Sequence, residues 1–219
     1  MPFIFFVVHE CCLAGVDLGE QAVQSGATAI THLFNAMRQF HHRDPGLIGL
    51  LGCIRSTDCE TPFYGLICDG VHVHPNSVRV AYHAHPHGAY LITDAISAMG
   101  LPPGEYCLTG QRVEKTHDRV YLADVQKEDG GKVLAGSCVT LIECVNNFVK
   151  FTGCSIAEAV DAASGKVARM LRIYGKKGVL ADGADADLVF LEDIQDQQGN
   201  VTWHVRRVFL AGEEVDLYG

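Results

Sequence analysis

The chain has 219 residues, with 26 Asp and Glu against 17 Lys and Arg, and a formal net charge of −9 at pH 7. A chain of this length can bury a substantial core, and its 48% hydrophobic and 20% charged residues are typical of a soluble globular protein. The acidic balance argues against a general affinity for nucleic acid. A site for an anionic ligand would therefore depend on a few well-placed Arg or His side chains.

The nine cysteines form no CxxC pair, and their number is odd. This pattern indicates reduced thiols in a cytoplasmic protein rather than a disulfide framework. The apolar stretch Met1–Val8 lacks a basic segment before it and is too short to cross a bilayer, so we expect a strand there and no membrane association.

The first hundred residues alternate between apolar strands and amphipathic or polar segments. A helix over 16–25 ends at Gly26, and a helix over 75–84 has Pro75 in its first turn. Asp44-Pro45-Gly46 closes a polar, His-rich loop over 38–49. The predicted strands are 3–8, 28–32, 64–69 and 89–93. This alternation predicts a parallel sheet with covering helices.

After residue 100 the pattern changes. Short Gly-rich and charged segments over 100–133 predict a β-hairpin excursion. Ser155 and Glu158 form a capping-box signature before one of three further helices; these helices are expected at 137–151, 155–164 and 166–173. Two alternating stretches, 187–191 and 205–210, predict a small antiparallel sheet that turns at 211–213.

Three predicted strands each have a metal-ligand or acid-base residue at their C-terminal end. A (β/α) barrel builds its active site in this way. His32 follows the strand at 28–32 and fits either a metal ligand or a hydrogen-bonded strand cap. Asp94 follows the strand at 89–93 and can either shuttle a proton from a metal-bound water to a leaving amine or cap the next segment. The pattern points to metal-assisted hydrolysis.

Other candidates surround these two. His72, in Asp69-Gly-Val-His72, can donate to a substrate oxygen, and Arg43 offers a bidentate fork for phosphate or is simply a solvated loop charge. Leu134-Ala135-Gly136-Ser137 precedes a predicted helix. Its backbone N–H groups can bind a ligand oxygen, Ser137 can serve as the N-cap of the helix, or both can hold.

The ordered set of motifs resembles the N-acetylglucosamine-6-phosphate deacetylases of the amidohydrolase superfamily. The set consists of Thr31-His-Leu-Phe-Asn-Ala-Met37, a His-Arg-Asp-Pro-Gly loop, Asp69-Gly-Val-His72, Thr93-Asp-Ala95, Leu134-Ala-Gly-Ser137 and Lys177-Gly-Val-Leu-Ala-Asp-Gly-Ala-Asp-Ala-Asp-Leu-Val189. The resemblance runs from about residue 14 to the C-terminus. It implies an α/β fold: the C-terminal half of a (β/α)8 TIM-type barrel over 1–178, followed by strands of a small β-sandwich over 179–219.

The resemblance also implies roles for single residues. His32 would bind a divalent metal ion, with zinc expected, and Asp94 would act as general base and then acid. Asn35, Ala36, His72, Leu134, Ala135 and Gly136 would contact the phosphosugar. Arg43 would bind its phosphate, often across the interface of a homodimer in this family. The reaction would convert N-acetylglucosamine 6-phosphate into glucosamine 6-phosphate and acetate.

Part of the family's metal site has no counterpart in this sequence. The position of a second histidine ligand falls on Cys11, with His9 two residues away, and a glutamate ligand belongs to an earlier strand. A half barrel also leaves two strand edges open, so we expect this chain to be unstable, oligomeric or a fragment of a longer product, and a truncated chain to be inactive. The alternatives are a non-catalytic phosphosugar-binding remnant and another amidohydrolase, such as a dihydroorotase-like or allantoinase-like cyclic amidase.

Overall fold

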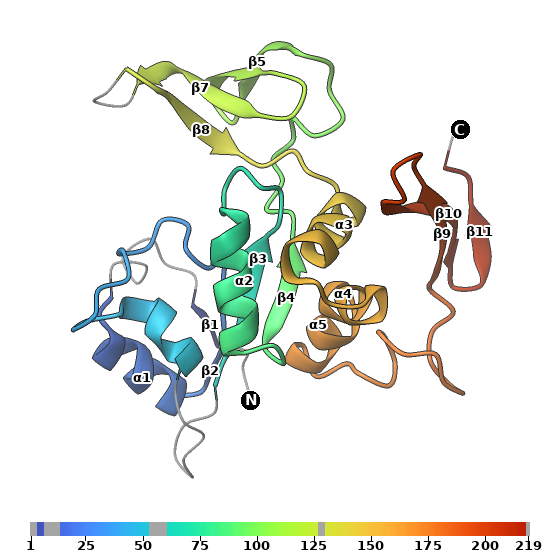
Figure 1. The fold of residues 1–219 in the computed structure, drawn as a ribbon, viewed down its shortest axis with the longest axis horizontal. Helices are drawn as coiled ribbons and strands as arrows, with labels where there is room; N and C mark the ends of the chain where they lie inside the picture. Colours follow the sequence, from blue (N-terminus) through green and yellow to red (C-terminus); the bar gives the residue numbers. More distant parts are fainter. Residues whose placement is uncertain (1–3, 7–13, 53–60, 127–129, 218–219) are drawn as a thin grey trace.

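The computed structural model describes residues 4–6, 14–52, 61–126 and 130–217, which form a mixed α/β structure (Figure 1). The sheet that carries the predicted site is parallel, in the order β1-β2-β3-β4. Its strands are β1 (Ile4–Phe6), β2 (Ala27–Ile30), β3 (Phe63–Ile67) and β4 (Ala89–Ile92). The predicted parallel sheet is therefore confirmed, and the rest of the strand predicted at 3–8 lies outside the described residues.

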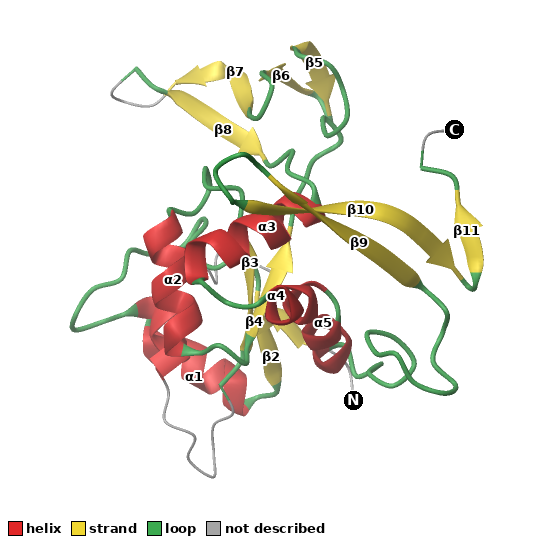
Figure 2. Cartoon of the chain, turned by 45° about the vertical axis from the view of Figure 1, so that its right-hand side comes forward, coloured by secondary structure: helices red, strands yellow, loops and turns green. Residues whose placement is uncertain are grey.

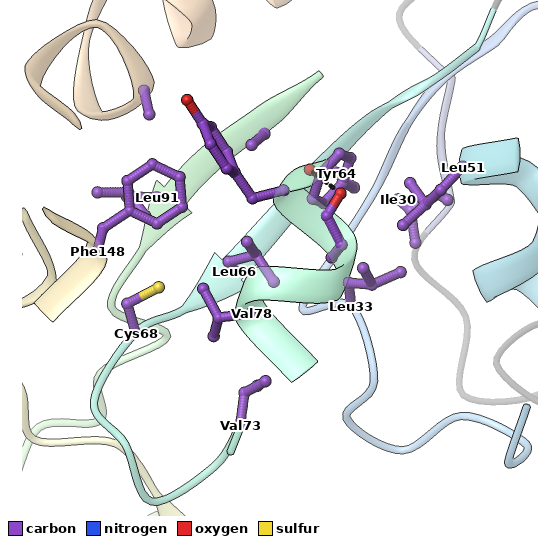
Figure 3. Close-up of a cluster of buried hydrophobic side chains, with 14 of the residues drawn as sticks. Ile30, Leu33, Leu51, Tyr64, Leu66, Cys68, Val73, Val78, Leu91 and Phe148 are labelled. Atoms are coloured by element: carbon purple, nitrogen blue, oxygen red, sulfur yellow. Dashed lines mark hydrogen bonds between the residues drawn. The ribbon is translucent and has the colours of Figure 1, made fainter. Parts of the chain in front are cut away.

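The main core lies where helices cover one face of this sheet, as Figure 2 shows. The helices of this core are α1 (Val16–Gln24), α2 (Pro75–Ala84), α3 (Leu141–Thr152) and α4 (Ile156–Ala163), whereas Met170 of α5 (Gly165–Met170) packs in a separate cluster with Ala29 and Tyr90. Leu66 and Leu91 from the strands meet Val78 from α2 and Phe148 from α3 in this core (Figure 3). The buried hydroxyl of Tyr64 donates to the carbonyls of Ala81 and His85, at 2.9 Å each, and ties β3 to α2.

Helices α3 and α4 both begin with a capping box. Ser155 and Glu158 satisfy each other's backbone amides at the start of α4, as the sequence predicts. Thr140 and Glu143 do the same for α3, which therefore begins at Leu141. The prediction that Ser137 caps a helix over 137–151 is wrong, because only Thr140 has a glutamate three residues later to complete the box.

The predicted loop over 38–49 ends in a 3₁₀ helix, η2 (Gly46–Gly52), which the sequence analysis missed. Its leucines Leu47 and Leu50 are buried against the core. The carboxylate of Asp44 accepts hydrogen bonds from the backbone N–H groups of Val16 and Gly46, and these two bonds hold the pKa of Asp44 below its ordinary value. Asp44 thus joins the loop to the start of α1.

The other two sheets are antiparallel: one follows β4 along the chain, and the C-terminal one lies on the far side of α3 from the parallel sheet (Figures 1 and 2). The predicted hairpin excursion is larger than expected, a four-stranded sheet of β5 (Gly104–Leu108), β6 (Gln111–Lys115), β7 (Val120–Gln126) and β8 (Lys132–Gly136). The predicted C-terminal sheet is confirmed as β9 (Leu188–Gln195), β10 (Val201–Leu210) and β11 (Glu213–Val215). Within the described residues, no helix has the length and apolar character needed to cross a membrane.

Candidate active site

His32 lies just beyond the C-terminal end of β2, where the chain turns sharply. The strand ends at Ile30, and His32, Phe34 and Ala36 all have positive φ angles, of 31°, 77° and 55°. Such angles are strained for residues other than glycine and are often found at functional sites. The Nδ1 atom of His32 is buried and has no hydrogen-bond partner among the described residues. A buried polar atom of this kind is costly unless a ligand satisfies it.

Asp94 lies at the equivalent end of β4 and faces the same cavity as His32. It is exposed and has a positive φ angle of 47°. The cavity has a volume of about 630 Å³ and is lined by Thr31, His32, Tyr90, Leu91, Ile92, Thr93, Asp94 and Leu141. The structure therefore brings together the predicted metal ligand and the predicted general base, as expected for the C-terminal ends of parallel strands.

Tyr90 lines this cavity and was missed by the sequence analysis. Its buried ring packs over Gly65, where an added Cβ would lie only 3.0 Å from Cζ of Tyr90. Its hydroxyl is 3.4 Å from the carbonyl oxygen of Ile30, and burial raises its pKa to about 12. The signal was present in the sequence, because strand alternation places Tyr90 and Ile92 on the face opposite to Leu91.

Leu134, Ala135 and Gly136 form the end of strand β8, not a turn before a helix. Ser137, the next residue, pairs with Ala95, and its carbonyl accepts a hydrogen bond from the N–H of Ile96 at 3.0 Å. These contacts place the end of the predicted sugar-binding segment beside Asp94. Leu134, Ala135 and Gly136 are not among the described residues that line the cavity, so their predicted contact with the sugar stays a prediction, and the turn predicted for them is wrong.

His72 follows β3 and is held by Asp69. Nδ1 of His72 lies 2.5 Å from Oδ2 of Asp69, while Oδ1 of Asp69 accepts hydrogen bonds from the N–H groups of Val71 and His72. Burial raises the pKa of Asp69, but the bonds from His72 and Val71 outweigh it, so the pKa lies below its ordinary value. His72 is not among the described residues that line the cavity of His32 and Asp94.

The remaining predicted contacts lie on the loop after His32. The N–H of Asn35 donates to the carbonyl of His32 at 2.9 Å, so Asn35 and the exposed Ala36 lie close to His32 along the chain. Arg43 is exposed, and no bond from its guanidinium to another described residue is seen, whereas Arg38 pairs with Asp44 at 2.8 Å. The structure leaves Arg43 accessible without placing it at the cavity.

His32 fits a metal ligand, since its orphaned Nδ1 is the kind of donor that divalent ions take from histidine. The described residues nevertheless gather no group of three His, Cys, Asp or Glu side chains that could hold an ion. His9 and Cys11, the other candidate ligands in the sequence, lie outside the described residues. The described part of the chain thus provides one candidate ligand, His32, rather than a full coordination shell.

A comparison with protein families matches residues 20–215 to the amidohydrolase family, and the chain belongs to that family. It is 44% identical over 203 residues to the N-acetylglucosamine-6-phosphate deacetylase of Danio rerio, covering 93% of this chain and 47% of that protein. The chain thus spans about half the length of the curated relatives it matches.

Solved structures give the same picture. The N-acetylglucosamine-6-phosphate deacetylase of Thermotoga maritima superposes with a TM-score of 0.74 at 32% identity, over 92% of this chain and 50% of that one. The enzyme of Mycobacterium smegmatis, solved as an aspartate-to-alanine mutant in complex with N-acetyl-D-glucosamine-6-phosphate, gives 0.74 at 30% identity, over 92% and 49%.

Proposed function

We propose that this chain supplies the acid-base and substrate-binding half of a site that hydrolyses the acetamide of N-acetylglucosamine 6-phosphate. The observation that carries the proposal is the shared cavity of His32 and Asp94 at the ends of β2 and β4. The similarity to deacetylases of this substrate supports the choice of reaction.

Amide hydrolysis forms a C–O bond with water and breaks the C–N bond, so one proton must move from the water to the departing nitrogen. Asp94 is exposed within the cavity and has a carboxylate that can accept this proton and then deliver it to the leaving amine. His32 would hold a divalent metal ion, with zinc the expected one. Such an ion, when bound, supplies Lewis-acid polarisation of the acetamide carbonyl.

The other predicted residues would fix the sugar and its phosphate. Asn35 and Ala36 follow His32 directly, and the end of Leu134–Gly136 lies beside Asp94 through the Ser137 contacts. His72 would contact the substrate from the end of β3. Arg43 would bind phosphate, because a guanidinium forms paired hydrogen bonds with phosphate oxygens.

We also propose that the parallel sheet and its helices, within residues 1–178, are the C-terminal half of a (β/α)8 barrel. Residues 179–219 would then belong to a separate β-sandwich. The match to about half of each relative supports a partial barrel, and the change from parallel strands to the antiparallel strands that begin at Leu188 supports the division. The four described parallel strands are half of the eight that a closed barrel requires.

A homodimer would allow Arg43 to act on the site of a second copy. An apolar groove of about 550 Å³ runs between η2 and α2, close in sequence to Arg43. Phe40 and Val80 line this groove and are 61% and 68% exposed. Exposure of such apolar side chains to water is unfavourable, and a second copy bound in the groove would cover them. Val80→Glu should therefore shift sedimentation toward the monomer, whereas Val125→Glu on β7 should not.

The direct test combines metal analysis, phosphosugar binding and acetate release on the purified chain. Bound metal together with release of acetate from N-acetylglucosamine 6-phosphate would support the full proposal. Phosphosugar binding that is lost in Arg43→Ala, without acetate release, would favour the non-catalytic alternative. Neither binding nor release would contradict both.

A further inference from the structure

Asp69 makes two different kinds of contact with its two carboxylate oxygens. Oδ1 accepts hydrogen bonds from the N–H groups of Val71 and His72, each at 2.8 Å, and so closes the turn after β3. Oδ2 faces Nδ1 of His72 at 2.5 Å. The side chains of Asp69 and His72 are only 10% and 14% exposed. One oxygen therefore builds the turn, and the other is directed at the imidazole.

This arrangement sets the tautomer of His72. Asp69 is ionised at neutral pH, since its bonds to His72 and Val71 hold its pKa below the ordinary value despite burial. An ionised carboxylate only accepts hydrogen bonds, so Nδ1 of His72 must carry a proton. In a neutral ring Nε2 then carries no proton and can accept a hydrogen bond from a ligand.

We propose that Asp69 is a positioning residue that fixes the tautomer and ring orientation of His72 so that Nε2 meets the phosphosugar. The proposal rests on the proposed function, in which His72 contacts that ligand. The turn requires only Oδ1 of Asp69, so the contact between Oδ2 and the imidazole is not needed to form the turn and acts on the ring alone. Without the contact to Asp69, the His72 side chain would be free to rotate and would lose that freedom when the ligand binds. The contact orders the ring beforehand and so lowers the entropy cost of binding.

Asp69→Asn separates the two contacts. The asparagine Oδ1 can still accept from Val71 and His72, but its amide group presents a donor where Oδ2 accepted. We expect the neutral His72 ring to change from the Nδ1–H to the Nε2–H tautomer, which ¹⁵N NMR of the imidazole distinguishes. We also expect the affinity for N-acetylglucosamine 6-phosphate to fall about tenfold, as for loss of one charge-assisted contact.

A matched control exists in the β9–β10 hairpin. Asp196 closes that turn with Oδ1, which accepts from the N–H groups of Gln198 and Asn200, while its Oδ2 accepts from the side chain of Asn200 rather than from a histidine. Asp196→Asn should therefore leave both the His72 tautomer and phosphosugar binding as they are in the unmodified chain.

A double-mutant cycle tests whether Asp69 acts through His72. If it does, adding Asp69→Asn to His72→Ala should cause no further loss of affinity. An unchanged tautomer in Asp69→Asn, unchanged affinity, or a loss that persists without His72 would each overturn the inference. Absence of phosphosugar binding by the unmodified chain would instead contradict the proposed function, and the inference with it.

Discussion

Gly136 and Ile96 are packed so closely that position 136 has no room for a side chain. An added Cβ would lie 2.6 Å from Cγ2 of Ile96, and the φ angle of Gly136 is 144°. This contact holds the end of β8 against the segment that follows Asp94. The fit between the two residues explains why the predicted sugar-binding segment contains a glycine at this point.

Gly136→Ala should lower the free energy of unfolding by about 2 to 4 kcal/mol, from overpacking and backbone strain together. Urea denaturation measures this loss. Gly110→Ala, in the β5–β6 turn, is the control, because Gly110 has a φ angle of 83° but an added Cβ there would meet nothing within 4 Å. Equal losses in the two variants would show that the contact with Ile96 is unimportant.

Asn146 and Trp203 join α3 to the C-terminal sheet. The amide of Asn146 donates to the carbonyl of Trp203, and the N–H of Trp203 donates back to Oδ1 of Asn146, both at 2.8 Å. Asn146→Ala should cost about 1 to 3 kcal/mol of stability and should speed hydrogen exchange at the Trp203 amide.

Asn147→Ala is the matched control for this pair. Asn147 donates to the carbonyl of Cys68 at 2.8 Å, and within the described residues its side chain makes no hydrogen bond to β10. It should therefore leave exchange at Trp203 unchanged. Equal exchange in the Asn146 variant and the unmodified chain would show that the reciprocal pair does not hold the sheet to α3.

Tyr90 should make the protein less stable at high pH. Its pKa is raised to about 12 in the folded state by burial, while the unfolded chain has the ordinary value of 10.0. The stabilising effect of the neutral phenol is full below pH 10 and is lost as the pH rises through 12, at a cost of about 2 kcal/mol. Urea denaturation at pH 9 and 12 should show a smaller decline in Tyr90→Phe. An identical decline would rule out this assignment.

His32→Ala should remove binding of zinc by the purified chain, measured by calorimetry after treatment with a chelator. His204→Ala is the control, because His204 is an exposed histidine on β10. If both variants bind zinc as the unmodified chain does, His32 is not a ligand, and its unpartnered Nδ1 needs another explanation.

The sequence predicts local structure well where a short segment carries the signal. Apolar runs that end in His32 and Asp94 predict two parallel strands, because parallel strands present their carboxyl ends at the same edge. The capping box at Ser155 is equally local and is confirmed. The sequence analysis missed the box at Thr140, although Thr140 and Glu143 have the same spacing.

Contacts between distant segments were harder to predict. The 3₁₀ helix η2 buries Leu47 and Leu50 in the main core. The polar residues around these leucines in the sequence made the segment look like a solvent-exposed loop. The pairing of Ser137 with Ala95 depends on how the β5–β8 sheet returns to the parallel sheet. Asp69 has a visible spacing to His72, but only the structure shows that its two oxygens act differently.

The most direct test of the account is the rate of acetate release from N-acetylglucosamine 6-phosphate by Asp94→Asn and by the unmodified chain, at equal metal loading. Removal of a general acid-base group should lower kcat by about 10²- to 10⁴-fold, while phosphosugar affinity changes little. Turnover by Asp94→Asn at the rate of the unmodified chain would contradict the role of Asp94. A complete lack of turnover by both would contradict hydrolysis by this chain.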